Sequence, residues 1–283
     1  MATATSQLRD ATATGPAPAL RFDHVSVRLG DRLALSDVTC EIEAGAFVGL
    51  IGPNGSGKST LLRAVLGVVP LSDGEIEVEG QSIAEARDSI AYLPQRQQLA
   101  LDLPLRACDV VMMGRLRHTG LFRPASRADK DAVTAALERV GLADRRNSPI
   151  GEMSFGQQQR VFFARALAQE GRILLLDEPM NGVDPQTQEV FVGLLNDFHA
   201  EGKTIVMATH DLNQAMSVCD HLIVLNQRLI VYGPSESSMT EEVLRDAYGV
   251  HLHVQHGPAH VDHIVEDLSH HDGEGHHHDA PLV

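Results

Sequence analysis

The chain has 283 residues, of which 43% are hydrophobic and 22% charged, a balance typical of a soluble globular protein of one large or two modest domains. Its net charge of −15 disfavours a nucleic-acid partner, because an acidic surface repels the phosphate backbone. No basic start followed by an apolar run opens the chain, and no apolar stretch approaches the roughly 20 residues that span a bilayer, so we expect neither a signal peptide nor a membrane helix.

Residues 1–20 are rich in Ala, Thr and Pro without a period, and we interpret them as a flexible tail before a domain over residues 21–250. Strand-like runs follow at residues 21–29, 38–42 and 47–51, with turns at Gly30-Asp31 and Ala44-Gly45. The third run leads through a glycine-rich loop into an apolar helix from Ser59 to about Val68. The pattern predicts a strand–loop–helix unit.

The middle of the chain, from about residue 97 to 171, is mostly helical in pattern. Residues 126–129 form a capping box, and the apolar positions after it lie on one helical face that ends at Gly141. A second helix is expected from Gly156 to about Gln169. The three cysteines, Cys40, Cys108 and Cys219, are widely spaced with no CxxC, which is typical of free thiols in a reducing compartment.

The last part alternates strands and helices again. Residues 173–176, 204–208 and 221–225 are short apolar runs, as expected for strands buried on both faces. The alternation predicts an α/β fold with a parallel sheet and helices on its faces. Beyond about Gly249 the chain becomes polar and histidine-rich, and we interpret residues 251–283 as a disordered tail.

A phosphate-binding loop is predicted where the third strand meets its helix. The pattern G-x-x-x-x-G-K-[ST] lets backbone N–H groups turn toward phosphate oxygens, while the lysine adds a point charge and the serine hydroxyl suits Mg²⁺. A chance glycine loop is the competing interpretation, but its position between a strand and a helix favours nucleotide binding. The predicted nucleotide-binding residues here are Gly52, Pro53, Asn54, Gly55, Ser56, Gly57, Lys58, Ser59 and Thr60.

Carboxylates end the apolar strand at residues 173–176. Asp177 would lie beside the phosphate loop and hold magnesium, and Glu178 would orient and deprotonate a water. A strand end capped by solvated acids would look the same without the upstream loop. His210 also follows a strand and could contact the terminal phosphate, although a lone histidine there is more often a surface residue; Gln95 is unremarkable by itself.

Residues 153–160, Met-Ser-Phe-Gly-Gln-Gln-Gln-Arg, resemble the signature motif of ABC transporter ATPases, and the ordered motifs from Leu20 to Gly249 resemble that family as a whole. The resemblance implies a P-loop NTPase core with a parallel sheet, a small antiparallel β subdomain and an inserted helical subdomain at about residues 97–171. It also implies roles for Gln95 in the Q-loop and with magnesium, for residues 181–184 as the D-loop, and for His210 as the switch histidine.

Family membership further implies that two copies face each other head to tail around two ATP molecules, with Glu178 as the general base. The signature and D-loop residues of one copy would contact nucleotide held by the other: Ser154, Gly156, Gln157 and Asp184. The N-terminal dipole of the helix beginning near Gly156 favours the anion. A membrane permease would bind the groove near Gln95 and the helical middle, at the cytoplasmic face of the membrane.

The family pattern is altered at two positions. The signature usually reads S-G-G-Q, and here Phe155 replaces the first glycine while Gly156 remains. The first strand usually ends in an aromatic side chain that stacks on adenine, and here that position is Leu29. Apolar contact would then replace stacking.

The resemblance also suggests a cargo. Residues 110–115, 120–123, 126–129 and 246–249 resemble the importers of zinc, manganese or iron, which implies an extracytoplasmic metal-binding protein in the same system. Ten of the 15 histidines lie in the tail, interleaved with Asp, and such ligands suit Zn²⁺. Our hypothesis is that the tail binds zinc and damps transport; a polar tail without a specific role is the competing interpretation.

Two other classes of protein share parts of this pattern. An ABC ATPase of DNA repair or translation usually carries two cassettes or long coiled-coil insertions, which this acidic chain lacks. An unrelated P-loop kinase would leave residues 154–160 and His210 unexplained. An exporter remains an alternative to an importer.

Overall fold

The computed structural model describes residues 17–95, 104–120, 123–249, 252–256 and 262–266. Residues 1–16 of the predicted N-terminal tail lie outside the described part. Of the predicted histidine-rich tail only the backbone of β11 (Leu252–His256) and β12 (Asp262–Glu266), which pair antiparallel, is described. The predictions about metal binding by that tail therefore lie outside the described residues.

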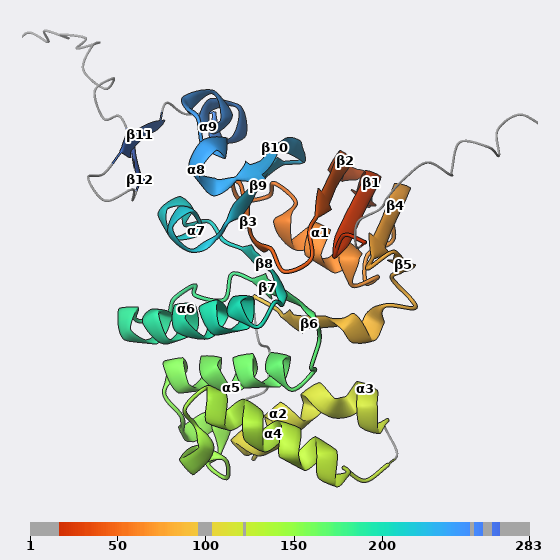
Figure 1. Ribbon diagram of the computed structural model, residues 1–283, viewed down its shortest axis with the longest axis vertical. Coiled ribbons are helices and arrows are strands. Elements are labelled where there is room, and N and C mark those ends of the chain that lie inside the picture. The colour runs from red at the N-terminus through yellow and green to blue at the C-terminus, as the bar shows by residue number, and fades with distance from the viewer. Residues whose placement is uncertain (1–16, 96–103, 121–122, 250–251, 257–261, 267–283) are drawn as a thin grey trace, which may run out of the picture.

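A six-stranded sheet forms the centre of the molecule (Figure 1). Its order is β10-β9-β3-β8-β7-β6, and every neighbouring pair is parallel except β10 with β9. The strands are β3 (Phe47–Ile51), β6 (Ile90–Leu93), β7 (Ile173–Asp177), β8 (Thr204–Ala208), β9 (His221–Asn226) and β10 (Arg228–Pro234). The predicted parallel sheet is confirmed, and the carboxyl ends of β3, β7 and β8 meet at one edge, where polar groups can converge.

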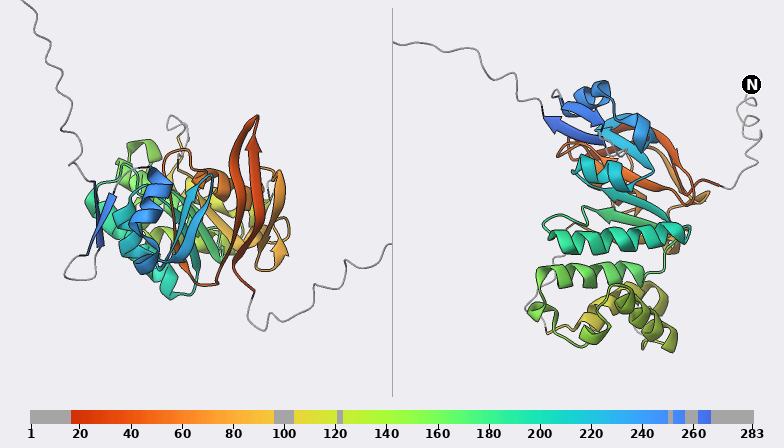
Figure 2. Two further views of the ribbon diagram at one scale, coloured as in Figure 1. Left: turned by 90° about the horizontal axis from the view of Figure 1, so that it is seen from above. Right: turned by 60° about the vertical axis from the view of Figure 1, so that its left-hand side comes forward.

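A second, antiparallel sheet of order β2-β1-β4-β5 stands beside the first (Figure 2). Its strands are β1 (Leu20–Leu29), β2 (Arg32–Ile42), β4 (Asp73–Val78) and β5 (Gln81–Ser82). Gly30 has φ 60° in the turn between β1 and β2, a left-handed conformation that glycine adopts without steric cost. This turn places Leu29 and Arg32 opposite each other at one end of the hairpin.

Helices cover both faces of the central sheet and build a separate layer (Figures 1 and 2). We call α2 to α5, together with the turns that join them, the helical subdomain; α6 lies between it and the sheet. The helices are α1 (Lys58–Val65), α2 (Ala107–Met112), α3 (Leu116–Thr119), α4 (Arg127–Arg139), α5 (Phe155–Leu167), α6 (Pro185–Ala200), α7 (Leu212–Val218), α8 (Ser235–Ser238) and α9 (Glu241–Tyr248).

The hydrophobic core has two parts because the central strands alternate their side chains between two faces. Phe47 and Ile51 of β3 face the cluster that includes α5 and α6, whereas Val48 and Leu50 face the cluster that includes α1 and the antiparallel sheet. The strands β3, β7 and β8 are buried along their whole length. This explains why they appear in the sequence as uninterrupted apolar runs.

Most predicted elements are confirmed with small shifts at their ends. The capping box at Ser126 and Asp129 starts α4. The first helix ends at Val65 rather than near Val68, because Gly67 takes φ 67° and the chain leaves the helix. The second strand begins at Arg32 rather than near residue 38, since hairpin pairing with β1 extends through its polar first half.

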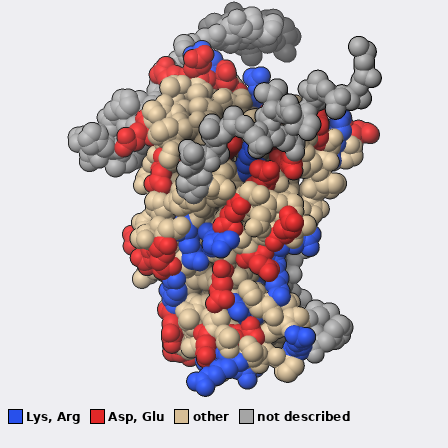
Figure 3. Space-filling model, turned by 45° about the vertical axis from the view of Figure 1, so that its right-hand side comes forward, with Lys and Arg blue, Asp and Glu red and all other residues tan. Residues whose placement is uncertain are grey.

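The described surface carries mixed charge. On the face drawn in Figure 3, acidic and basic side chains are interspersed over the helical subdomain and the sheets, and no extended basic patch is seen there. Among the described residues, every helix is too short or too polar to cross a bilayer.

Candidate nucleotide-binding and hydrolysis site

The loop between β3 and α1 depends on glycine at two positions. Gly52 has φ 150°, and a Cβ there would lie 2.0 Å from the carbonyl oxygen of Leu225. Gly57 has φ 104° and caps α1; a Cβ there would lie 2.5 Å from Leu35 Cδ2. The backbone therefore closes into a cradle at the positive end of α1, as an anion site requires.

A cavity of about 260 Å³ lies over this cradle. It is lined by the turn region of the β1–β2 hairpin, by most of the loop, and by two residues that follow the ends of β6 and β7. The lining residues are Leu29, Arg32, Ala34, Asn54, Gly55, Ser56, Gly57, Lys58, Ser59, Thr60, Gln95 and Glu178. Thus all but Gly52 and Pro53 of the predicted loop residues line one cavity, together with Leu29.

Lys58 is held inside the loop. Its Nζ donates hydrogen bonds to the carbonyl oxygens of Gly52 at 2.7 Å and Pro53 at 3.2 Å. The residue is only 7% exposed, and burial lowers the pKa of the ammonium group, while Glu178 and Asp177 act in the opposite direction. The ammonium group is thus positioned at the cradle by the backbone itself.

Two of the three predicted magnesium ligands, Ser59 and Asp177, lie in contact. The Ser59 hydroxyl donates to Oδ1 of Asp177 at 2.9 Å, while Oδ2 of Asp177 is buried without a hydrogen-bond partner. Burial raises the pKa of this carboxyl, and the hydrogen bond from Ser59 offsets part of that effect. A hydroxyl beside an unpartnered carboxylate oxygen is a donor set that suits a hard cation, so these residues fit Mg²⁺.

Glu178 lies at the centre of a cluster of polar side chains. Its Oε2 accepts hydrogen bonds from Gln95 Nε2 at 2.6 Å and Asn181 Nδ2 at 2.9 Å, and His210 Nδ1 lies 3.7 Å away. The backbone of Glu178 has φ 49°, and its N–H donates to the Ala208 carbonyl at 2.9 Å. The three side chains predicted to be catalytic are therefore brought together at one point.

This cluster separates two cavities. Glu178 lines both the cavity over the cradle and a second one of about 150 Å³, whose walls include Asn181, Thr209 and His210. Gln95, predicted also as a magnesium ligand, lines the first cavity with its Nε2 directed to Glu178. A carboxylate between a phosphate cradle and a second cavity is placed to act on a water beside a bound phosphate.

Leu29 and Arg32 line the end of the cavity that lies against the antiparallel sheet. Leu29 is 49% exposed and offers an apolar wall, as expected from the position of the missing aromatic residue. Arg32, which the sequence analysis did not identify, donates from Nη2 to the Gly55 carbonyl at 3.3 Å. Its hairpin register opposite Leu29 was the available signal, since paired positions at a strand end share one neighbourhood.

The signature residues lie elsewhere. Ser154 is the N-cap of α5 and forms a reciprocal capping box with Gln157, at 3.3 Å and 3.1 Å. Ser154, Gly156 and Gln157 are absent from the lining of both cavities described above. Phe155 beside them is 53% exposed, so the tip of this helix is an open surface of the chain.

Asp184, the fourth residue predicted to act across a dimer, caps α6. Its carboxylate accepts from the Thr187 N–H at 3.0 Å and the Thr187 hydroxyl at 2.7 Å, and these bonds lower the pKa of Asp184. A Cβ at Gly156 would lie 2.7 Å from Thr187 Oγ1. The tips of α5 and α6 are therefore in contact, and the glycine is required by packing within the chain.

Acidic, histidine and cysteine side chains do not gather into a larger metal centre in the ranges that the structure describes. Within those ranges, no group of three or more such residues could hold an ion. The three cysteines are free, as expected from their spacing.

The sequence is similar to a known family and to proteins of known name. Residues 35–181 match the family described as ABC transporter. The chain is 43% identical over 233 residues to the manganese transport system ATP-binding protein MntA of Synechocystis, covering 81% of this chain and 90% of that protein. It is 41% identical over 235 residues to the chelated iron transport system membrane protein YfeB of Yersinia pestis, covering 82% of this chain and 79% of that protein.

Solved structures show the same architecture. The chain superposes with a TM-score of 0.69 on cbiO1 of Clostridium perfringens, part of the ABC transporter complex cbiONQ, at 27% identity, covering 82% of this chain and 96% of that one. Residues 35–181, which match the family, contain the phosphate loop, the helix α5 that follows Ser154, and the strand that ends at Asp177.

Proposed function

The chain belongs to the family of ABC transporter ATP-binding subunits, which hydrolyse ATP and work with a membrane permease, and from that premise we propose that it energises import of a divalent metal ion, manganese or zinc. The names of its relatives support a metal cargo, since one is called a manganese and another a chelated iron transport protein. Iron is thus a third candidate.

The position of Glu178 carries the hydrolytic part of the proposal. ATP phosphates would lie in the cradle, where loop amides and Lys58 offset their charge. Ser59 and Asp177 would hold magnesium, which when bound would supply positive charge beside the phosphate oxygens. Glu178, held by Gln95 and Asn181, would then accept a proton from the attacking water.

His210 and the signature helix would recognise the terminal phosphate. His210 lines the second cavity beside Glu178 and can donate to an oxygen of that phosphate. The N-terminus of α5, capped by Ser154, offers free backbone N–H groups and a positive dipole end. Since Ser154 does not line the cavity of its own chain, the proposal requires a second copy, so that the working unit is a head-to-tail homodimer.

We place this dimer at the cytoplasmic face of the membrane, beneath the permease, with an extracytoplasmic metal-binding protein delivering the ion. The absence of a membrane-crossing helix from the described residues supports dependence on another chain. The resemblance of residues 110–115 and 246–249 to metal-ion importers supports the direction of transport.

Reconstitution with the permease tests the proposal. Wild-type vesicles should accumulate manganese or zinc when ATP is supplied, and Glu178→Gln vesicles should bind ATP without uptake or turnover. Gln keeps the size of the side chain and one oxygen acceptor, but it has neither the negative charge nor the basicity of the carboxylate. If Glu178→Gln hydrolyses ATP at the wild-type rate, Glu178 is not the base. If wild-type vesicles hydrolyse ATP but take up none of the three metals, the proposed cargo is wrong.

A further inference from the structure

Strand β6 is the edge strand of the central sheet, and a side chain covers its free side. An edge strand leaves one row of backbone groups without a strand partner. Gln169 fills that row at Tyr92: its Oε1 accepts from the Tyr92 N–H at 3.2 Å, and its Nε2 donates to the Tyr92 carbonyl at 3.3 Å. One amide group thus takes the place of a neighbouring strand.

Two further contacts fix the same strand. Gly171 lies against its backbone so closely that a Cβ there would be 2.4 Å from the N atom of Ala91. Arg117 of α3 donates from Nη1 to the carbonyls of Arg87 at 2.6 Å and Ile90 at 3.2 Å. The edge of β6 is therefore attached to the segment after α5 and to the helical subdomain.

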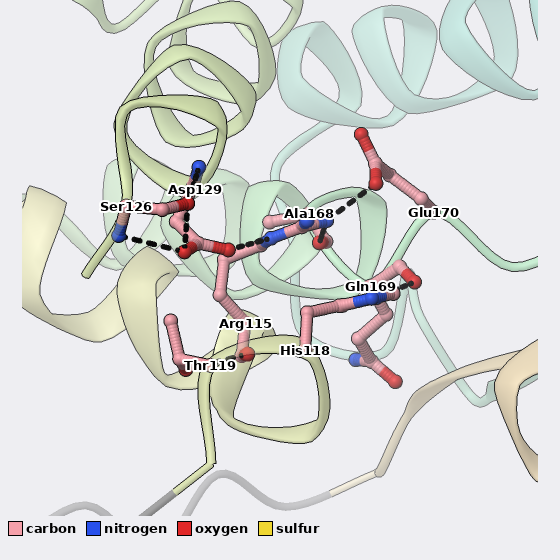
Figure 4. Close-up of polar contacts among 8 residues, drawn as sticks. All are labelled: Arg115, His118, Thr119, Ser126, Asp129, Ala168, Gln169 and Glu170. Atoms are coloured by element: carbon pink, nitrogen blue, oxygen red, sulfur yellow. Dashed lines mark hydrogen bonds and ion pairs between the residues drawn. The ribbon is translucent and has the colours of Figure 1, made fainter. Parts of the chain in front are cut away.

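An ion-pair network around the buried Arg115 anchors that segment from the other side (Figure 4). Arg115 donates from Nε to Asp129 at 3.0 Å, and from Nη1 to the Ala168 carbonyl at 2.8 Å and the Glu170 carboxylate at 2.6 Å. Arg115 and Asp129 are 5% and 4% exposed. These two residues belong to the stretches that resemble metal-ion importers, and here they join α3, α4 and the end of α5 into one unit.

His118 completes the attachment next to Gln169. Its Nε2 lies 3.2 Å from the Gln169 carbonyl oxygen, and Figure 4 shows both side chains beside the Arg115 network. The Gln169 backbone is thus bonded to the helical subdomain, and its side-chain amide is bonded to Tyr92.

Tyr92 is three residues before Gln95, whose Nε2 lies 2.6 Å from Oε2 of Glu178. We propose that Gln169 is a positioning residue: its amide couples the helical subdomain to β6 and thereby sets the distance between Gln95 and Glu178. A hydrogen bond weakens steeply as its distance and angle depart from the optimum, so a shift of a fraction of an ångström at β6 alters the orientation of Glu178. This inference rests on the hydrolytic role proposed for Glu178.

The test uses Gln169→Met in the full chain, because Met fills the same volume and offers neither hydrogen bond. Displacing a catalytic group by up to about 1 Å costs roughly 10- to 100-fold in rate, so we expect kcat for ATP hydrolysis to fall by that factor. KM for ATP should stay within about twofold, because Gln169 does not line the nucleotide cavity. Gln169→Glu keeps the acceptor for the Tyr92 N–H, so its kcat should lie between those of wild type and Gln169→Met.

Arg139→Gln is the matched control. Arg139 of α4 also joins the helical subdomain to the core, through Glu201 at 2.6 Å and the face of Phe198. Among the described residues these two partners belong to α6 and the turn after it, and not to β6. Removal of Arg139 should lower the melting temperature about as much as Gln169→Met while leaving kcat within twofold. A merely structural role for Gln169 would make the two variants alike.

The outcomes separate this inference from the proposed function. If Glu178→Gln is inactive and Gln169→Met has the same kcat as Arg139→Gln, the positioning role of Gln169 is wrong, whereas the hydrolytic role of Glu178 is supported. If Glu178→Gln hydrolyses ATP like wild type, the proposed base itself is wrong. A loss of kcat confined to Gln169→Met and, partly, Gln169→Glu supports the coupling.

Discussion

Replacing Asp177 by Asn should stabilise the chain without nucleotide and remove its response to magnesium. Asp177 is 1% exposed, and its Oδ2 lacks a hydrogen-bond partner. Leaving a buried polar group unsatisfied costs about 1–3 kcal/mol, and more when it is charged. Attraction to Arg63 and Lys58 offsets part of that cost, so we expect a net gain of about 1 kcal/mol in Asp177→Asn.

The gain corresponds to a rise of about 2–4 °C in melting temperature for a domain of this size. Because burial raises the pKa of Asp177 in the folded chain, the cost of the ionised side chain is present at neutral pH and vanishes as the pH falls through the raised value. The difference between Asp177→Asn and wild type should therefore shrink in acid.

The assay is thermal denaturation with no ligand, with ATP and EDTA, and with ATP and Mg²⁺. A ligand at 100 times its Kd stabilises the folded state by about 2.7 kcal/mol, so wild type should gain a clear increment from Mg²⁺ that Asp177→Asn lacks. Asp211→Asn is the control, since Asp211 is an exposed N-cap of α7 and Asn caps equally well. An Asp177→Asn chain less stable than wild type, or one with the same magnesium increment, would refute the reasoning.

Three further predictions concern binding. Lys58→Ala removes a charge-assisted contact of about 1.5–3 kcal/mol, so ATP should bind roughly 10- to 150-fold more weakly in calorimetric titration, and unchanged affinity would contradict the cradle. Leu29→Tyr adds stacking on adenine of at least about 1 kcal/mol, so the same titration should show about fivefold tighter binding; an equal or weaker Kd would argue against placing the base there. Deleting residues 255–283 should make ATPase activity insensitive to zinc, and an unchanged zinc dependence would retire the sensing hypothesis.

Strands buried on both faces were the most predictable part of the fold. The predicted run at residues 204–208 coincides with β8, because a parallel strand between two helical layers has apolar side chains on both sides. Strand β6 has only four residues and is followed by Pro94, so its sequence contains too little pattern for prediction. Strand β4 is largely polar because one face is exposed, and it is stabilised by pairing with β1, which local sequence does not encode.

The phosphate cradle was predictable because its chemistry lies in consecutive residues. Glu178 and Asp177 could be placed because a parallel strand carries its last residues to the edge where the loop lies. The contacts of Gln169 could not be predicted, since Gln169 and Tyr92 are 77 residues apart and meet only once the helical subdomain is packed. Arg32, by contrast, could have been placed near Leu29, since the two residues flank the Gly30-Asp31 turn and pair across the hairpin.

The covered edge of β6 also bears on self-association. Exposed strand edges recruit strands from other molecules, which leads to intermolecular sheets and insoluble material. Here the Gln169 amide and the Arg117 guanidinium occupy the carbonyl and amide groups on which such recruitment would depend. These contacts leave fewer backbone groups open for such pairing at the strand that leads to Gln95.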